Sequence, residues 1–251
     1  MNTKKNLGFT LIEILVATAI STISIIAVFY LYQFFNNSYK SLLDKAEMNE
    51  SGRSSLSIVS RDLRNAGYKD INYNNTWDRL IEQVDNYNNT GSDSLTIWYN
   101  SSPTDRIQIQ YFLKKYDSTN EMYLARDVIE NPVTNPKYIY CERASVQKNC
   151  APLNIVPYVT DFQVILKDAD GKELRPVCAT CSSTLGKANQ LRVHTAEVYV
   201  TVRSTNEIYK KKKIIKIINH NSSTGKEKNL EDKYLRDTFY VSTYLRNIVK
   251  N

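Results

Sequence analysis

Histidine and glycine are both scarce in this sequence, and their scarcity excludes several function classes. Of the 251 residues only two are histidine, His194 and His220, and seven are glycine. Two histidines nearly exclude a histidine-rich metal site and weaken any triad built on a histidine base. Seven glycines leave little material for a glycine-rich phosphate loop, and no nucleophile elbow is present. We therefore expect no enzyme, no cofactor and no metal site.

The charge balance is mildly basic. Lys and Arg total 33 against 26 Asp and Glu, which gives a net charge of +7. This excess is below the density of a dedicated nucleic-acid-binding protein. With 42% hydrophobic and 24% charged residues the chain can bury a core. Its length predicts one to two domains.

The amino terminus holds a long apolar run, from Phe9 to Phe35, whose one charged residue is Glu13. About 20 apolar residues suffice to span a bilayer as a helix. Lys4 and Lys5 precede the run, so the start of the chain is expected in the cytoplasm and the rest outside. Three interpretations compete: a signal peptide cleaved near Ala17-Thr18-Ala19, a plain signal anchor, and a membrane helix in which Glu13 has a functional partner.

The residues around the start of this run favour the third interpretation. Gly8-Phe9-Thr10-Leu11-Ile12-Glu13 resembles the processing site of type IV pilins and type II secretion pseudopilins. The resemblance implies that a prepilin peptidase cuts after Gly8 and methylates the new amino terminus at Phe9. It also implies that Glu13 acts in assembly, where it neutralises the α-amino cation of a neighbouring subunit. Two charges in an apolar bundle cost less paired than alone.

Helical pattern continues beyond the apolar run. Residues 36–66 contain no proline and one glycine, Gly52. Leu56, Val59, Leu63 and Ala66 recur with helical spacing and predict one buried face. Gly67 stands where a glycine commonly ends a helix. We expect one helix over 9–66, softened at Gly52 or at Asn36-Asn37-Ser38.

The remainder predicts strands. Residues 68–90 predict an irregular connection with a short helix at Trp77–Val84, and Asp168 to Gly171 predict a hairpin turn in which Asp168 and Asp170 form the turn. Alternating side chains place Ile107, Ile109 and Tyr111 on one face, with similar faces in two later segments. In Leu191–Arg203 the expected core face is Arg192, His194, Ala196, Val198, Val200 and Val202. In Tyr234–Leu245 the side chains of Phe239, Val241 and Thr243 share one face. The expected strands are Ser94–Tyr99, Arg106–Leu113, Glu121–Arg126, Lys137–Cys141, Asp161–Lys167, Leu191–Arg203, Ile208–Ile218 and Tyr234–Leu245. The class is α+β, a long amino-terminal helix packed on a mostly antiparallel β-sheet domain.

Several segments are similar, in order, to PilW-type minor pilins and in part to J-type pseudopilins. They are Asp62–Tyr68, Ser92–Leu95, Leu124–Arg126, Val156–Val164, Val198–Ser204 and Leu235–Asn247. The lysine run at 210–213 and the Asn-rich stretch within 68–90 depart from that family.

The similarity implies four parts: a leader at 1–8, a membrane or filament-core helix at 9–35, its amphipathic continuation at 36–67 and an exported domain at 68–251. It implies a non-enzymatic pilus subunit, inserted once in the inner membrane and later present in the pilus at the cell surface. The partners it implies are prepilin peptidase, other minor pilins, the major pilin, the inner-membrane assembly platform and membrane lipid. A type II secretion pseudopilin and a membrane-tethered adhesin or binding domain are the alternatives.

All four cysteines, Cys141, Cys150, Cys178 and Cys181, follow the apolar run. An exported domain permits disulfides, and local pairs close short loops, so we expect Cys141–Cys150 and Cys178–Cys181. A four-cysteine zinc site is the alternative, because Cys178-x-x-Cys181 has ligand spacing. Redox catalysis by that pair lacks a supporting helix amino terminus.

Four consecutive lysines, Lys210, Lys211, Lys212 and Lys213, form the densest local charge. The simplest interpretation is a solvated hairpin tip. The alternative is contact with DNA or another anionic surface. Tyr209 is the one neighbouring aromatic, which does not support stacking on single-stranded nucleic acid.

Overall fold

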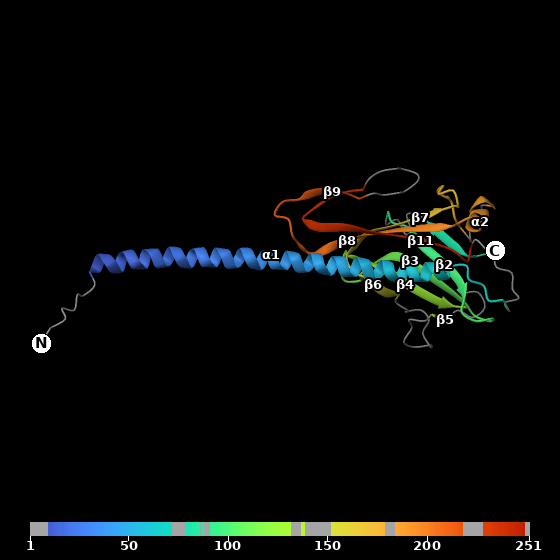
Figure 1. Ribbon diagram of the computed structural model, residues 1–251, viewed down its shortest axis with the longest axis horizontal. Coiled ribbons are helices and arrows are strands. Elements are labelled where there is room, and N and C mark those ends of the chain that lie inside the picture. Colours follow the sequence, from blue (N-terminus) through green and yellow to red (C-terminus); the bar gives the residue numbers. More distant parts are fainter. Residues whose placement is uncertain are drawn as a thin grey trace. The chain divides into compact units, whose positions relative to one another are not determined.

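The computed structural model describes residues 10–71, 79–85, 87, 91–131, 137–138, 152–178, 184–217 and 228–248. A long helix, α1 (Leu11–Asn65), precedes the strands, and a short helix, α2 (Thr184–Gln190), lies late in the chain. In chain order the strands are β1 (Ile81–Val84), β2 (Ser94–Asn100), β3 (Arg106–Lys115), β4 (Met122–Glu130), β5 (Lys137–Tyr138), β6 (Leu153–Val156), β7 (Val159–Lys167), β8 (Thr195–Glu207), β9 (Lys213–Ile217), β10 (Lys228–Asp232) and β11 (Tyr234–Tyr244). The predicted α+β class is confirmed (Figure 1).

The chain divides into two units, Met1–Lys45 and Ala46–Asn251, and the division falls within α1. The helix is continuous through Gly52 and through Asn36–Ser38, so neither interrupts it, and the softening there stays a prediction. An added Cβ at Gly52 would lie 2.2 Å from a ring carbon of Phe239, so this glycine makes room for a strand side chain. The helix ends as predicted, because Gly67 adopts a φ of +74°, which favours glycine.

The described residues of the second unit form three antiparallel sheets. The largest has the order β1-β2-β3-β4-β5, with β6 also paired to β4. A three-stranded sheet has the order β11-β8-β7, and β9 pairs with β10. The predicted turn after β7 is present, since Gly171 has a φ of +78° and Leu174 N donates to Leu166 O.

The core of this unit lies between the carboxyl-terminal half of α1 and the two larger sheets. The predicted helix face is confirmed, because Leu56, Val59, Leu63 and Ala66 are all buried. The predicted strand faces are confirmed too: Ile109 and Tyr111 on β3 are buried, and Ile107 packs against the core. On β8 and β11 the side chains that face the core are Ala196, Val198, Val200, Val202, Phe239, Val241 and Thr243. The predicted core face is wrong at Arg192, which is exposed, and at His194, which is half-buried; Val193 is buried instead, because these residues precede the start of β8.

The short helix predicted at Trp77–Val84 is wrong over its described part. Residues 81–84 form β1, which pairs with β2 through Ile81 and Ile97. Leu80 and Ile81 are buried by this pairing, so tertiary packing overrides a weak local pattern. Strands β8 and β6 also differ from expectation: β8 begins at Thr195 because α2 and a turn precede it, and β6 was not predicted.

Buried polar contacts join the helix to both larger sheets. The Asp62 carboxylate accepts from Tyr111 Oη at 2.5 Å and from Arg126 Nε and Nη2, each at 2.7 Å. On the other side, Thr243 Oγ1 of β11 lies 3.0 Å from Ser60 Oγ. Because Ser60 and Asp62 are two residues apart, they lie on different sides of the helix, and the contacts on both sides fix its rotation about its axis.

A second polar cluster joins the two larger sheets at the edge of β7. Val164 N donates to Asp93 Oδ2 at 2.9 Å, and Gln83 Nε2 donates to Val164 O at 2.5 Å. Ser92 Oγ donates to Asp161 Oδ1 at 2.7 Å. Burial is the main cause that raises the pKa of Asp93 to about 7 from its ordinary 3.8. The edge of β7 is thereby occupied by groups from the other sheet.

Candidate functional site: the amino-terminal helix

The first turn of α1 is a capping box formed by Thr10 and Glu13. The Glu13 carboxylate accepts from Thr10 N at 2.8 Å and from Thr10 Oγ1 at 2.9 Å. In return, Glu13 N donates to Thr10 Oγ1 at 3.4 Å. Such reciprocal contacts satisfy amide groups that the helix itself leaves without partners. The structure therefore holds the one acid of the apolar run at the positive end of the helix dipole.

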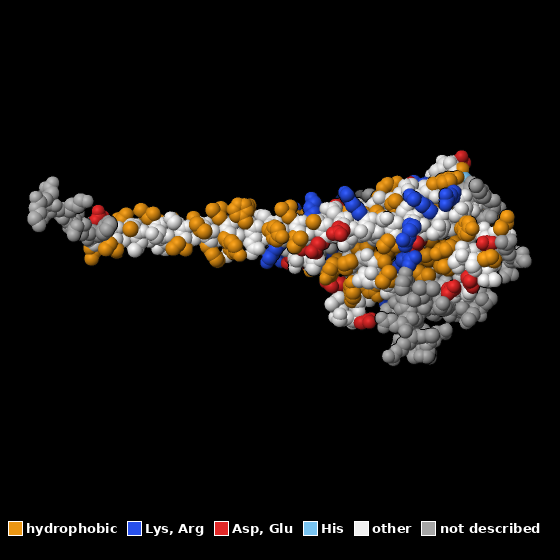
Figure 2. All heavy atoms as spheres, turned by 60° about the horizontal axis from the view of Figure 1, so that its bottom comes forward, with side chains coloured by type: hydrophobic (Ala, Val, Ile, Leu, Met, Phe, Trp, Pro, Cys, Tyr) orange, Lys and Arg blue, Asp and Glu red, His pale blue; other side chains and the backbone are white. Residues whose placement is uncertain are grey.

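The side chains that follow are apolar and exposed on every side of the helix. The exposed fractions include 59% for Ile20, 65% for Phe34 and 57% for Leu31. Figure 2 shows apolar side chains spread along this surface among uncharged polar ones. Among the described residues one helix, α1, is long and apolar enough to cross a membrane. A helix that is apolar all round requires an apolar environment, either lipid or other helices.

Hydroxyl groups within the apolar run are satisfied by the helix backbone. Thr18, Ser21, Thr22 and Ser24 donate to carbonyls three or four residues earlier, at 2.7 to 2.9 Å. Because their hydrogen bonds are internal, these residues can enter lipid without bringing unsatisfied donors. Glu13 is the one charged side chain between Thr10 and Phe35, so it is the residue of this segment that is most costly to place in lipid.

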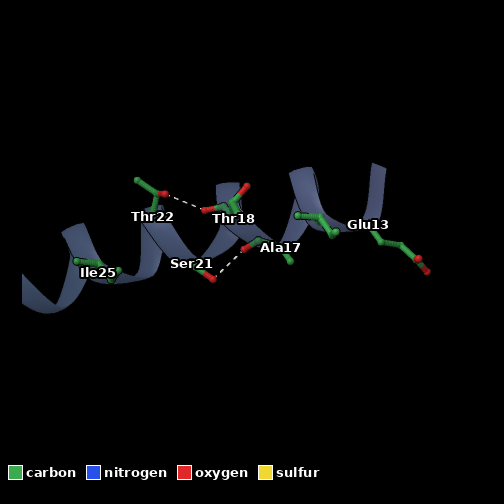
Figure 3. A pocket seen from close by; sticks show the side chains of 7 residues that line it. Glu13, Ala17, Thr18, Ser21, Thr22 and Ile25 are labelled. Atoms are coloured by element: carbon green, nitrogen blue, oxygen red, sulfur yellow. Dashed lines mark hydrogen bonds between the residues drawn. The ribbon is translucent and has the colours of Figure 1, made fainter. Parts of the chain in front are cut away.

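A stripe of small side chains begins beside Glu13. Ala17 and Ser21 follow it at steps of four residues, with Thr18 and Thr22 alongside, and the larger Ile25 comes next in the row (Figure 3). Small residues four apart let two helices approach closely in a membrane. This stripe was not predicted, although the four-residue spacing of Ala, Ser and Thr in the sequence was the signal for it. The surface suits packing against another helix along a line that contains the acid.

Other predicted site residues are placed as follows. Gly8 and Phe9 lie outside the described residues, as do Cys141, Cys150 and Cys181. Lys210 to Lys213 are exposed in the connection between β8 and β9 and at the first residue of β9. Asp168 forms its turn as predicted, since its Oδ1 accepts from Asp170 N and Lys172 N.

Cys178 is the one predicted disulfide cysteine within the described part of the chain. Its sulfur donates to Glu82 Oε1 at 3.2 Å. The two expected bridges stay predictions, because each includes a partner that lies outside the described residues.

Asp62, Tyr111 and Arg126 form a buried polar cluster in the second unit. Burial, followed by the Asp62 charge, raises the pKa of Tyr111, so its phenol stays protonated and donates to Asp62. Asp62, Tyr111 and Arg126 are all held by one another between a helix and a sheet. Within the described ranges no group of three His, Cys, Asp or Glu side chains is arranged to hold a metal ion.

A family model described as the prokaryotic N-terminal methylation motif matches residues 3–29. The chain carries this motif. The match supports the resemblance to the type IV pilin superfamily, and with the apolar helix it indicates a membrane-anchored protein. A search of curated proteins found no match. Among solved structures, a type IV-like pilin from Thermus thermophilus is similar, with a TM-score of 0.48 and 13% identity. The alignment covers 81% of this chain and 96% of that one.

Proposed function

We propose that this protein is a PilW-type minor pilin that takes part in the assembly or priming of a type IV pilus. One observation carries the proposal: an apolar helix, exposed on all sides, begins with a single capped acid inside a methylation motif. A simple anchor has no use for that acid, and an acid in a membrane segment normally has a partner.

The chemistry of assembly follows from charge and apolar surface. Prepilin peptidase cuts after Gly8, and the methylated Phe9 then carries an α-amino cation. Glu13 of one subunit pairs with that cation on a neighbour as the two helices come together. The small side chains from Ala17 to Thr22 let the helices approach along the line that holds the acid. An unpaired charge in this bundle is costly, so correct registration is favoured over slipped packing.

The proposed location follows the orientation of the helix. The protein crosses the inner membrane once, with its amino terminus in the cytoplasm and the β-rich unit outside, and later joins the pilus at the cell surface. Its partners are prepilin peptidase, the other minor pilins, the major pilin, the inner-membrane assembly platform and membrane lipid. In this role the protein is structural and performs no catalysis.

Two alternatives share part of this reasoning. A J-type pseudopilin of a type II secretion system would use the same helix, motif and acid, and partners recovered by affinity capture would distinguish it. A membrane-tethered adhesin or binding domain would need the helix alone, and would keep its leader.

The deciding experiment is the mass and amino-terminal sequence of the protein purified from cell envelopes. We expect a chain that begins with N-methylated Phe9. A chain that still begins at Met1 would indicate a plain signal anchor. A chain that begins at Ile20 would indicate a secreted protein. Either of these two results would overturn the proposal.

A further inference from the structure

The four lysines Lys210 to Lys213, called here the lysine loop, have a fixed base and exposed side chains. Ile208 N and Tyr209 N both donate to Lys233 O, at 3.0 and 2.9 Å. Lys213 Nζ lies 4.0 Å from the centre of the Tyr209 ring, a cation–π contact. All four lysines are exposed. The loop thus presents its charges from a defined place in the fold.

Two acids close to the lysine loop are bound by other cations. Asp232 is the cross-strand neighbour of Lys213, but Arg236 holds both of its carboxylate oxygens at 2.5 Å. The hydrogen bonds from Arg236 are the main cause that lowers the pKa of Asp232. Glu207 pairs with Lys233 at 3.1 Å. Within the described part of the chain, no acid forms an ion pair with the lysine loop.

The register between β11 and α1 locates the loop within the second unit. On β11, Phe239 lies over Gly52 of α1, and Thr243 contacts Ser60 of α1. The two contacts are four residues apart on the strand and eight residues apart on the helix. Four strand residues and eight helix residues both span about 12–13 Å, so β11 and this part of α1 run in the same direction. Tyr234, at the start of β11, pairs with Glu207 at the end of β8. The lysine loop therefore leaves the unit at the end where α1 enters it at Ala46 (Figure 1).

A short tether keeps this end of the unit near the membrane. The apolar run ends at Phe35, and residues 36–45 separate it from Ala46. As a helix these residues span about 15 Å. Whatever the relative orientation of the two units, the Ala46 end cannot move far from the bilayer surface. An anionic surface attracts basic residues within about a Debye length, 8 to 10 Å at physiological salt.

We propose that the lysine loop binds the anionic phospholipid headgroups of the membrane that holds the apolar helix. This inference rests on the membrane insertion in the proposed function. Ile214, which follows the lysines, is 69% exposed, and a basic cluster beside an exposed apolar residue suits the lipid interface. DNA fits the loop less well, because its one aromatic, Tyr209, already contacts Lys213. The contact holds the β-rich unit at the bilayer before the subunit joins a filament.

Lysine acylation in nanodiscs tests this contact on the full chain. The probes are discs of phosphatidylcholine alone and discs that also contain phosphatidylglycerol, and mass spectrometry reads each lysine. We expect acylation of Lys210 to Lys213 to slow by about threefold or more in anionic discs and to recover in about 0.5 M salt. Lys172 and Lys187, which are exposed elsewhere, are the matched internal controls and should not change.

Two variants separate charge from fold. Amide hydrogen exchange of residues 208–214 should slow in anionic discs for the wild type and for Lys→Arg at all four positions, but not for Lys→Gln at all four.

Equal acylation in both kinds of disc would overturn the lipid contact while leaving insertion intact. Protection by duplex DNA in neutral discs would assign the loop to nucleic acid instead. A chain that fails to enter either disc would refute the proposed insertion itself.

Discussion

The two halves of α1 have similar apolar side chains and opposite surroundings. Before Lys45 the apolar residues lie on all sides of the helix and are exposed, as for Ile20 and Leu31. After Ala46 they lie on one face and are buried, as for Val59 and Leu63, both 0% exposed. The difference shows that angular distribution, more than apolar content, decides which partner a helix requires. The first half suits lipid or a helical bundle, and the second suits the core of its own domain.

The largest expected effect comes from a change at Glu13, the one charged residue of the apolar run. Glu13→Gln keeps a hydrogen-bond acceptor for Thr10 but removes the charge, so it separates capping from pairing. We expect pilus assembly to fall about tenfold or more, with membrane insertion unchanged, because the neighbouring cation loses its partner. Piliation assays and membrane fractionation measure the two effects.

Thr10→Ala is the matched control for Glu13→Gln. It removes the Thr10 hydroxyl from the capping box and keeps the Glu13 charge, so assembly should remain close to wild type. If Thr10→Ala abolished assembly and Glu13→Gln did not, the acid would act only as a helix cap, and the pairing role would be wrong.

In the buried half the largest expected loss comes from Arg126. Arg126→Met leaves the Asp62 carboxylate buried without its guanidinium, which should cost about 3–5 kcal/mol in the free energy of unfolding. The control is Arg61→Met: Arg61 also lies near Asp62, at 3.6 Å, but its side chain is 71% exposed. We expect that change to cost about 0–1 kcal/mol. Chemical denaturation in detergent, followed by tryptophan fluorescence, compares them, and equal losses would contradict the assignment.

A leucine pair tests the two environments directly. Leu63→Ala should lower the free energy of unfolding by about 2–5 kcal/mol, because it opens a cavity in the core. Leu31→Ala removes the same atoms from a residue that is 57% exposed, so unfolding of the β-rich unit should not change. A comparable loss from both variants would show that the exposed half packs within its own subunit.

Asp93 should make the stability of the second unit depend on pH. Its raised pKa, about 7 against an ordinary 3.8, means that the folded state holds its proton more tightly than the unfolded state. This residue therefore contributes stability that is present below about pH 4 and is lost as pH rises through about 7, by up to a few kcal/mol. Asp93→Asn keeps acceptors for Val164 N and Gln83 Nε2. As pH rises from 5 to 8, we expect the free energy of unfolding of the variant to increase relative to that of the wild type. Chemical denaturation at both pH values measures this, and an unchanged difference between variant and wild type would contradict it.

Segments that carry the resemblance to minor pilins coincide with the buried polar contacts of the fold. Asp62 and Arg126, from two such segments, form one ion pair, and Asp93 from a third binds the backbone of Val164 in a fourth. A single sequence showed these segments in the right order but not that they pair. The reason is physical: contacts between residues about 60 to 70 positions apart leave no local periodicity.

Local regularity explains which predictions were confirmed. The buried helix face, the alternating strands and the glycine at the helix end each follow from spacing within one element. The strand at Ile81–Val84 was missed because four residues carry too little pattern, and pairing with β2 decides their conformation. The stripe from Ala17 to Thr22 was present in the spacing and was overlooked.

The sequence by itself determined the helix, its apolar first half, the lone acid and the α+β class, because these depend on composition and on periods of 3.6 and two residues. Tertiary structure alone decided that Gly52 receives Phe239, that Asp62 is neutralised by Arg126, and that Arg236 and Lys233 pair with two acids beside the lysine loop. Each of these depends on which distant residues pack together. That choice follows from burying one common core, and it cannot be made one element at a time.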